Sequence, residues 1–495
     1  MIEAQILYGK LKAICQEMGN NLFRNSRSAL LARDRSYAVG LLTGDLELAV
    51  QIQYDPEHLF ALRESTRSMF DYFSYDIAEG DVLLIADPYQ GGTQGQTITM
   101  AAPYFHDGEL MLFPVIRAQM SDMAGEYPGG YHAEAFEVWQ ESLRLSPIKL
   151  YKGGVLQRDV MRFLLANSRV STLFASDLLA MYACGQAAHQ QIQALLKQIR
   201  PEMIKEYVSL MFDYNAKRVY KHIQSFSTVS GQGKAVFTAG AAGQVEITVT
   251  VRREENELVL DFTGTGSEVA GPYNSPPAMT AAYAVWPVLA PVFEDISINE
   301  GTLRAFRVKA DEGSLVHPNF PAATAFSGKV TGHFIAQAVS QALKGSFAAS
   351  DGGSDIHGPG PQAILYEPVG LSPETELLFL TPGFPTAANG WGPPGLNGDR
   401  LLVSAEELEM HHGFQLWKRE REDEAQGGMI VTMINGQEAL QMNVIVPEGE
   451  AGSIGCITVG ETAYRRSANA VTLQKGDQLV FHYPGARSGE SGGTA

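Results

Sequence analysis

The pattern of apolar and polar residues in the first part of the chain predicts a sheet with accompanying helices. Apolar residues at helical spacing between positions 2 and 18 indicate an amphipathic opening helix, and a second helix is expected at about 57–75. The segment 80–89 contains a continuous apolar run typical of a buried strand, which Pro88 must end. Further strands are expected over 37–42, 46–52, 98–104 and 109–116.

The pattern then changes to helical between about 155 and 225, where Pro201 separates two helices that are expected to form a hairpin. Period-two alternation returns after Ser225 and predicts a pair of strands within 244–264. The later part of the chain predicts helices within 280–291 and 331–345, a helix opened by the capping box of Ser404 and Glu407, a tight hairpin at Asn435–Gly436, and a flexible tail over 486–495.

Strands and helices occur in blocks rather than in strict alternation, which predicts a mixed α+β fold with several domains. The expected regions are 1–154, an N-terminal α/β region; 155–225, a helical hairpin; 226–400, a central α/β region; and 401–495, a mostly β region with a flexible tail. Long irregular segments such as 117–152 are more often functional than idle, so the site is expected in the first region.

Composition narrows the class of protein. The chain has 495 residues, 45% of them hydrophobic, so it can bury a large core. A formal net charge of −18 argues against nucleic acid or an anionic membrane as a partner, since both need basic surface. The three cysteines are far apart, which favours a reducing cytoplasm over a disulfide framework, and no apolar run reaches the roughly 18 residues of a membrane span.

Three familiar motifs are only partly present. Ser327–His333, "SGKVTGH", resembles a phosphate loop, but Val330 stands where Ser or Thr is required and the upstream glycine is missing. Gly489–Gly493 satisfies G-x-S-x-G, yet it lies in the expected tail rather than at a strand-to-helix turn. Structural roles are expected for His333, His357, His411 and His412.

Candidate chemistry gathers in two segments, "IADPYQGGTQGQT" at 85–97 and the long stretch from Arg117 to about Lys152. Two predicted strands lie between the segments and can bring both to one rim of a sheet. Such convergence predicts a pocket.

These segments also carry a family resemblance. The order of "ADPYQGGT", "LRLSPIKLY", "LVLDFTGTG", "GPYNSPPAMT", "NEGTLRAFRVKADEGSLVHPNFPAA" and "GDQLVFHYPG" resembles the hydantoinase B and oxoprolinase family, which includes the matching subunit of acetone carboxylases. The resemblance extends from the first helix to about Gly485 and implies a hydantoinase B-like fold.

Members of this family commonly have G-G-T-H-x-x-D in the first segment and R-x-H-H-x-D in the second, and the resemblance implies that these residues bind divalent manganese, zinc or iron. Here the corresponding positions are Gln94, Thr97, Gln119 and Met120, whose side chains are poor ligands for such ions. We therefore expect that the family metal site is lost and that this chain binds no cofactor.

The resemblance nominates residues for the remaining site. The family identities are kept at Asp87, Arg117 and Asp122, of which Arg117 is expected to clamp an anion and Asp122 to act as general base. Substrate-orienting groups are expected at Thr93, Gln94, Thr97, Gln119 and His132. His132, Glu134 and Glu137 are also possible substitute ligands for a metal.

The implied function is that of a subunit in an ATP-dependent hetero-oligomer. A hydantoinase A-like partner would use ATP and Mg²⁺ to activate a carbonyl or cyclic amide, and this subunit would complete ring-opening hydrolysis or carboxylation, with small or paralogous subunits as further partners. Two alternatives stay open: a non-catalytic scaffold subunit of such a complex, and a stand-alone hydrolase without metal or ATP.

Overall fold

The computed structural model describes most of the chain up to residue 343 and parts of the chain beyond it. The described residues are 2–74, 76–226, 230–292, 296–343, 362–366, 378–380, 409, 414–421, 429–436, 439–449, 452–453 and 455–483. In this part of the chain, every helix is too short or too polar to cross a lipid bilayer.

A seven-stranded sheet forms the first layer, with strand order β2-β1-β7-β4-β3-β8-β9. Its strands are β1 (Tyr37–Leu42), β2 (Leu48–Gln53), β3 (Val82–Ala86), β4 (Thr97–Ala101), β7 (Phe113–Gln119), β8 (Leu145–Lys152) and β9 (Val155–Leu156), and a small hairpin of β5 (Phe105–His106) and β6 (Glu109–Leu110) lies between β4 and β7 along the chain. All neighbouring strands are antiparallel. The strands predicted for this region are confirmed, with shifted ends. The prediction that 117–152 is irregular is wrong for its last part, because β8 pairs there with β3 and extends the sheet.

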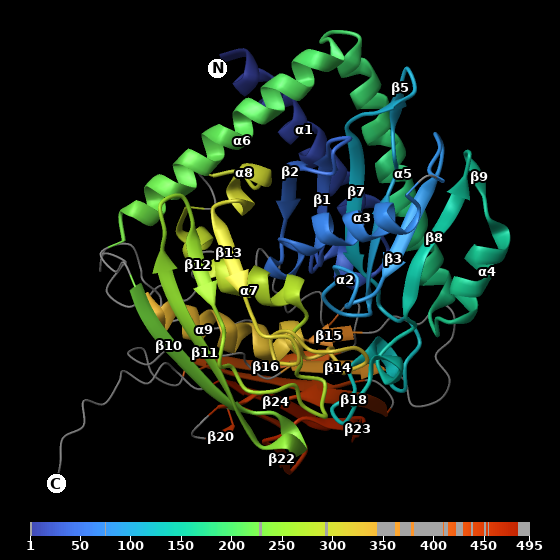
Figure 1. Ribbon diagram of the computed structural model, residues 1–495. Coiled ribbons are helices and arrows are strands. Elements are labelled where there is room, and N and C mark those ends of the chain that lie inside the picture. The colour runs from blue at the N-terminus through green and yellow to red at the C-terminus, as the bar shows by residue number, and fades with distance from the viewer. Residues whose placement is uncertain are drawn as a thin grey trace.

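Helices lie over both faces and around the edges of this sheet (Figure 1). They are α1 (Ile2–Asn25), α2 (Ala29–Ala32), α3 (Ala61–Tyr72), α4 (Arg158–Ala166), α5 (Ser171–Leu196) and α6 (Pro201–Gln224), with short turns η1 (Pro56–His58), η2 (Pro128–Gly130) and η3 (Val138–Gln140). Val39 and Ile116 face Gly19 of α1 and Gly185 of α5. Because side chains alternate along a strand, the neighbouring Arg117 points to the opposite face, beneath α3.

Pro201 stands at the first position of α6, as its fixed φ favours, so the predicted division between two helices is confirmed. The two helices do not run side by side, however. In Figure 1, α5 lies behind the sheet while α6 crosses over its upper end. Both helices pack against α1.

The second layer is a six-stranded sheet of order β13-β12-β11-β10-β19-β20. Its strands are β10 (Ser230–Thr238), β11 (Gln244–Arg253), β12 (Leu258–Asp261), β13 (Phe306–Lys309), β19 (Glu448–Gly449) and β20 (Gly452–Ser453), and the associated helices and turns are α7 (Pro277–Leu289), η4 (Gly240–Ala242), η5 (Ala290–Val292), α8 (Glu300–Leu303), the π-helix η6 (Ser327–Thr331) and α9 (Gly332–Ala342). The antiparallel pairing of β11 with β12 confirms the predicted strand pair.

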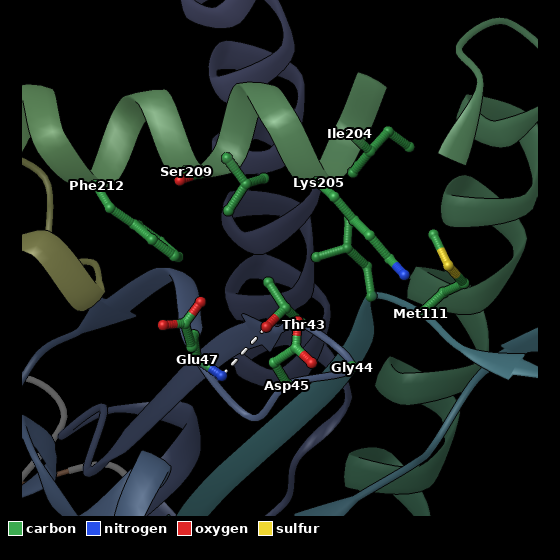
Figure 2. A pocket seen from close by; sticks show the side chains of 11 residues that line it. Thr43, Gly44, Asp45, Glu47, Met111, Ile204, Lys205, Ser209 and Phe212 are labelled. Carbon is green, nitrogen blue, oxygen red and sulfur yellow. Dashed lines mark hydrogen bonds between the residues drawn. The ribbon is translucent and has the colours of Figure 1, made fainter. Parts of the chain in front are cut away.

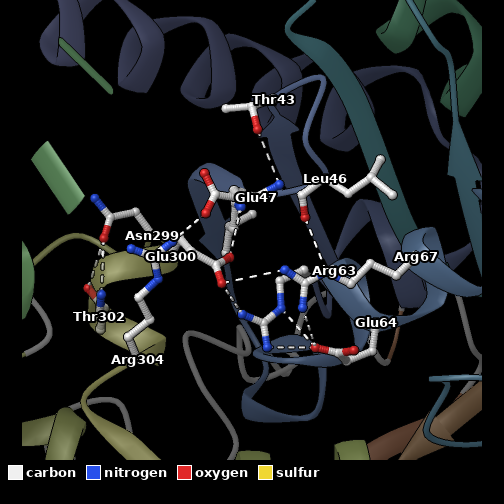
Figure 3. A network of polar contacts seen from close by, with 11 residues as sticks. Thr43, Leu46, Glu47, Arg63, Glu64, Arg67, Asn299, Glu300, Thr302 and Arg304 are labelled. Carbon is white, nitrogen blue, oxygen red and sulfur yellow. Dashed lines mark hydrogen bonds and ion pairs between the residues drawn. The ribbon is translucent and has the colours of Figure 1, made fainter. Parts of the chain in front are cut away.

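An ion-pair network fastens α8 to α3 and β2 (Figure 3). Oε1 of Glu300 lies 2.7 Å from Nη1 of Arg63 and 3.5 Å from Nη2 of Arg67. Its other oxygen accepts the backbone N–H of Leu48 at 3.1 Å. This carboxylate therefore joins α8, which lies between β12 and β13 along the chain, to β2 at the edge of the first sheet.

Two further sheets come from the C-terminal part. The four-stranded sheet is β15-β14-β18-β23 and the five-stranded sheet is β16-β17-β24-β21-β22. Their strands are β14 (Gln362–Tyr366), β15 (Leu378–Leu380), β16 (Phe414–Arg421), β17 (Met429–Asn435), β18 (Leu440–Ile445), β21 (Cys456–Val459), β22 (Thr462–Tyr464), β23 (Ala468–Leu473) and β24 (Gln478–Tyr483).

The tight hairpin predicted at Asn435–Gly436 is wrong, because β17 and β18 belong to different sheets. Asn435 instead docks on the turn before β24: its side chain donates to the carbonyls of Leu473 and Gln474, and its backbone N–H donates to Asp477. The helix expected from Ser404 and Glu407 lies outside the described residues.

Two hydrophobic cores hold the described residues together. The larger one extends from Ala4 to Leu343 and also includes Ile364, Tyr366 and Ile445, so it has members in all four expected regions. The smaller one packs the C-terminal sheets, from Ala363 to Phe481. The exact division into domains stays a prediction.

Candidate functional site

The two candidate segments meet where β4 begins and β7 ends. Thr97 lies directly opposite Gln119 in the antiparallel pair, and Thr99 lies opposite Arg117. All four side chains are buried and point to the face beneath α3, since strand neighbours two apart share a face. The structure therefore brings together four polar side chains from the two candidate segments.

Gln94 reaches this group from the loop after β3. Its amide nitrogen lies 3.5 Å from Oε1 of Glu57 and 3.5 Å from Oγ1 of Thr97. A carboxylate accepts hydrogen bonds but cannot donate them, so this end of the amide is the NH₂ group. Its oxygen is buried and has no hydrogen-bond partner among the described residues. A ligand with an N–H or O–H donor would satisfy it.

Gln119 has both ends of its amide occupied. The hydroxyl of Ser36 donates to its oxygen at 2.8 Å, and its nitrogen donates to the hydroxyl of Tyr131 at 2.8 Å. This residue connects the start of β1 with the loop that comes after β7.

Arg117 is a buried cation surrounded mainly by hydroxyl groups. It donates to Thr99 at 2.8 Å, to Thr93 at 2.5 Å and to Ser65 of α3 at 3.4 Å, while its Nε has no partner among the described residues. Burial lowers the pKa of this guanidinium to about 10, although the nearby Glu57 carboxylate acts in the opposite direction. Arg117 therefore carries its charge at neutral pH.

Lys329 approaches from the second layer of the fold. It lies in the π-helix η6, is only 8% exposed, and places Nζ 5.9 Å from the ring centre of Tyr131. Its neighbour Gly328 packs against Glu57 so closely that a Cβ there would lie 3.0 Å from Oε2. Single π-turns inside helices are frequent at functional sites.

We call this group of buried polar residues the polar centre. Its members are Ser36, Glu57, Thr93, Gln94, Thr97, Thr99, Arg117, Gln119, Tyr131 and Lys329. The sequence-based prediction included five of them and missed Ser36, Glu57, Thr99, Tyr131 and Lys329.

Asp87 and Asp122 are buried at the margin of the centre and are held by arginines. Asp87 accepts from Nε of Arg144 at 2.7 Å and from the backbone N–H of Tyr89 at 2.9 Å. Asp122 accepts from Nη1 of Arg169 at 2.9 Å and from the same residue's backbone N–H at 2.8 Å. Both carboxylates shape loops in this state, and their expected catalytic roles stay predictions.

His132 is buried beside the ring of Tyr127, with Nδ1 3.8 Å from Oε2 of Glu126. Burial lowers the pKa of its imidazole more than the two nearby carboxylates, on Glu126 and Glu134, raise it, so the neutral form dominates at pH 7. Glu134 is exposed, whereas the side chain of Glu137 caps η3. The suggested roles of these three residues stay predictions.

The polar centre does not fit a divalent metal of the kind that the resemblance implies. Among the described residues, no three His, Cys, Asp or Glu side chains are grouped closely enough to bind one ion. The centre offers one carboxylate, on Glu57, and one adjacent imidazole, on His58, whose Nε2 lies 3.9 Å from Oε1 of Glu57. Its other donors are amides and hydroxyls, which bind transition ions weakly. The expected loss of the metal site stays a prediction that metal analysis can test.

A separate small groove lies at the other end of the first sheet (Figure 2). It is lined by the β1–β2 turn around Asp45, by Met111, and by residues of α6 that include Lys205 and Phe212. β1 runs from Tyr37 beside the polar centre to Leu42 next to this turn, so the groove is remote from the candidate chemistry.

These features agree with comparisons with known proteins. Residues 1–398 match the family model described as hydantoinase B/oxoprolinase, so the chain belongs to the hydantoinase B/oxoprolinase family. The fold is similar to that of the ATP-dependent caprolactamase from Pseudomonas jessenii, with a TM-score of 0.85 and 21% identity over 98% of this chain and 90% of that one. Nucleotide-free acetone carboxylase gives a TM-score of 0.82 and 12% identity over 98% of this chain and 75% of that one.

Two curated relatives illustrate the family. The chain is 24% identical to the B component of a putative D-/L-hydantoinase from Pseudomonas sp. (strain NS671), covering 72% of this chain and 64% of the relative. It is 23% identical to 5-oxoprolinase from Dictyostelium discoideum, covering 69% of this chain and 27% of the relative. The chain thus spans less than two thirds of the length of these relatives. Family and mixed α+β fold are confirmed.

Proposed function

We propose that this chain is the hydantoinase B-type subunit of an ATP-dependent heteromeric enzyme that acts on a carbonyl compound or cyclic amide. A hydantoinase A-like ATPase partner would activate the substrate with ATP and Mg²⁺, and the polar centre would receive the activated species. Membership in the hydantoinase B/oxoprolinase family supports this division of work.

The observation that carries the proposal is the unpartnered oxygen of Gln94 inside a group of buried polar side chains. Leaving a buried acceptor without a partner costs about 1–3 kcal/mol, so such groups need an explanation. A ligand that donates a hydrogen bond to this oxygen would remove the cost, and an oxygen of the same ligand would accept from the unpartnered Nε of Arg117. A cyclic amide carries both an N–H and a carbonyl.

A scaffold role is the competing function, and one observation favours it: the carboxylates of Asp87 and Asp122 are already engaged by arginines. A scaffold would keep the fold and the surface for its partner without using the polar centre. Substitutions inside the centre would then leave turnover unchanged.

The test is ATP-dependent turnover of 5-oxoproline, hydantoin and caprolactam by the complex co-purified with its ATPase partner. Gln94→Leu should lower kcat/KM at least tenfold while the complex still assembles, because the amide group is replaced by an apolar one of similar size. Gln198→Leu, at an exposed position, is the matched control and should be neutral. Unchanged kcat/KM in Gln94→Leu would favour the scaffold, and absence of any ATP-dependent turnover would refute the enzymatic proposal.

A further inference from the structure

A lysine stands at the polar centre, close to the positions from which relatives are expected to bind a metal. Lys329 is buried, and its Nζ lies 5.9 Å from the centre of the Tyr131 ring. The hydroxyl of that tyrosine is hydrogen bonded to Gln119, one of the positions that replace the expected ligands. A positive charge therefore comes from a side chain on a different segment of the chain.

The contacts around this lysine close into a ring. They run from Lys329 through Tyr131, Gln119, Thr97, Gln94 and Glu57 to Gly328, which precedes Lys329 in the chain. Three of these residues, Gln94, Thr97 and Gln119, are the ones that stand in place of histidine and aspartate. The ring brings these positions and the lysine into one buried site.

Besides Nε of Arg117, further buried polar atoms in the polar centre and in η6 are unsatisfied. The oxygen of Gln94 and the hydroxyl of Ser327, two residues before Lys329, are buried and have no partner among the described residues. Unpaired buried polar atoms beside a buried cation point to a polar ligand rather than to apolar packing.

We infer that the ammonium group of Lys329 takes the electrostatic role of a divalent cation, so that the polar centre binds a carbonyl or carboxylate oxygen without metal. This inference rests on the proposed function for its ligand class. An ammonium group supplies one positive charge and three hydrogen-bond donors, which can stabilise negative charge on a substrate oxygen. Unlike zinc, it does not generate a hydroxide from bound water, so the attacking group must be activated elsewhere.

The decisive experiment measures zinc and manganese binding by the full chain. The wild-type protein should retain less than about 0.1 equivalent of either metal after dialysis, since a single carboxylate among neutral oxygens binds these ions weakly. The combination Gln94→His, Thr97→Asp and Gln119→His should restore zinc binding, and adding Lys329→Met should tighten it at least tenfold by removing a like charge. Stoichiometric metal in the wild type, or equal zinc affinity with and without Lys329, would overturn the inference.

Melting temperature and circular dichroism identify variants that do not fold. A second measurement then uses single substitutions with 5-oxo-L-proline as the probe, whose binding Lys329→Met should weaken at least tenfold and Lys329→Arg less than threefold. Equal binding by wild type and Lys329→Met would count against the inference. Failure of the proposed enzyme is distinguishable, because an inactive complex leaves the zinc results unaffected.

Discussion

The backbone of Gly91 lies directly on α3, which explains why the loop after β3 is rich in glycine. Its φ is +79°, and a Cβ there would lie 2.4 Å from the carbonyl carbon of Glu64. A side chain at this position would need both a strained backbone and a shift of the helix. The loop that carries Thr93 and Gln94 is held in place by this close approach.

Gly91→Ala should therefore destabilise the protein more than an alanine that meets only backbone strain. Gly108 is the matched control, because its φ is +82° and nothing lies within 4 Å of its added Cβ. We expect Gly108→Ala to cost about 1 kcal/mol and Gly91→Ala about 1–3 kcal/mol more. Urea unfolding at pH 7 measures both, and equal losses would show that the contact with α3 is unimportant.

Residue roles were harder to predict than residue proximity. The order of strands and loops was enough to bring Gln94, Thr97 and Gln119 together, because the first segment ends where β4 begins and the second begins where the neighbouring β7 ends. Lys329 was missed because it belongs to the second layer and meets the polar centre only where the two layers pack together. A contact of that kind leaves no local pattern in the sequence. The sequence does mark Lys329, as part of the incomplete phosphate-loop motif at Ser327–His333, but that motif does not indicate contact with the polar centre.

At the scale of elements, Glu141 connects the loop after β7 to the segment that leads into η6 by hydrogen bonds. Its buried carboxyl group accepts the backbone N–H groups of Thr324 and Ala325, at 2.8 and 2.7 Å. This connection helps to position Lys329 in η6. The segment 117–152 was expected to be irregular and functional, yet its partner near residue 324 could not be foreseen from spacing.

Burial raises the pKa of Glu141 from 4.5 to about 8, even though these hydrogen bonds act to lower it. Between pH 4.5 and 8 the folded chain keeps a proton on Glu141 that the unfolded chain has lost. The stability that comes from this proton is complete below pH 4.5 and is lost as pH rises through 8. The stability gap between wild type and Glu141→Gln should change in the same direction, by up to about 1.4 kcal/mol per pH unit. Urea unfolding from pH 5 to 8 checks this; a gap independent of pH would contradict it.

Element types were predicted well where periodicity was long, as in α1, α6 and β11. The error at Asn435–Gly436 has a tertiary cause, because a turn signal reports that the chain changes direction but not which sheet receives the next strand. Here β18 joins a different sheet. The side chain of Asn435 donates to the carbonyl of Leu473, 38 residues further along the chain, at the turn before β24.

At the scale of the whole molecule, Glu300 connects the two main layers through Arg63 and Arg67. The exposed fractions of the Glu300 and Arg63 side chains are 6% and 12%, so the pair is largely shielded from water. Burial alone would raise the pKa of Glu300. The two arginines and the backbone N–H of Leu48 together lower it by more, so the pKa lies below its usual value. The layers that meet at the polar centre are thus also joined by charge at a separate place.

Glu300→Gln should lower the free energy of unfolding by up to about 3 kcal/mol at pH 7, the low end for a broken buried pair because Arg63 keeps Glu64 as a partner. The stabilisation is present above pH 4.5 and is lost as pH falls through the lower folded pKa, so the gap to wild type should narrow between pH 5 and 3.5. Glu109→Gln is the control, since it removes an exposed ion pair with Lys205 and should cost less than about 1 kcal/mol. If both variants unfold at the same urea concentration as wild type, the network in Figure 3 does not hold the layers together. A large loss that stays constant down to pH 3.5 would mean that packing, and not charge, makes the connection.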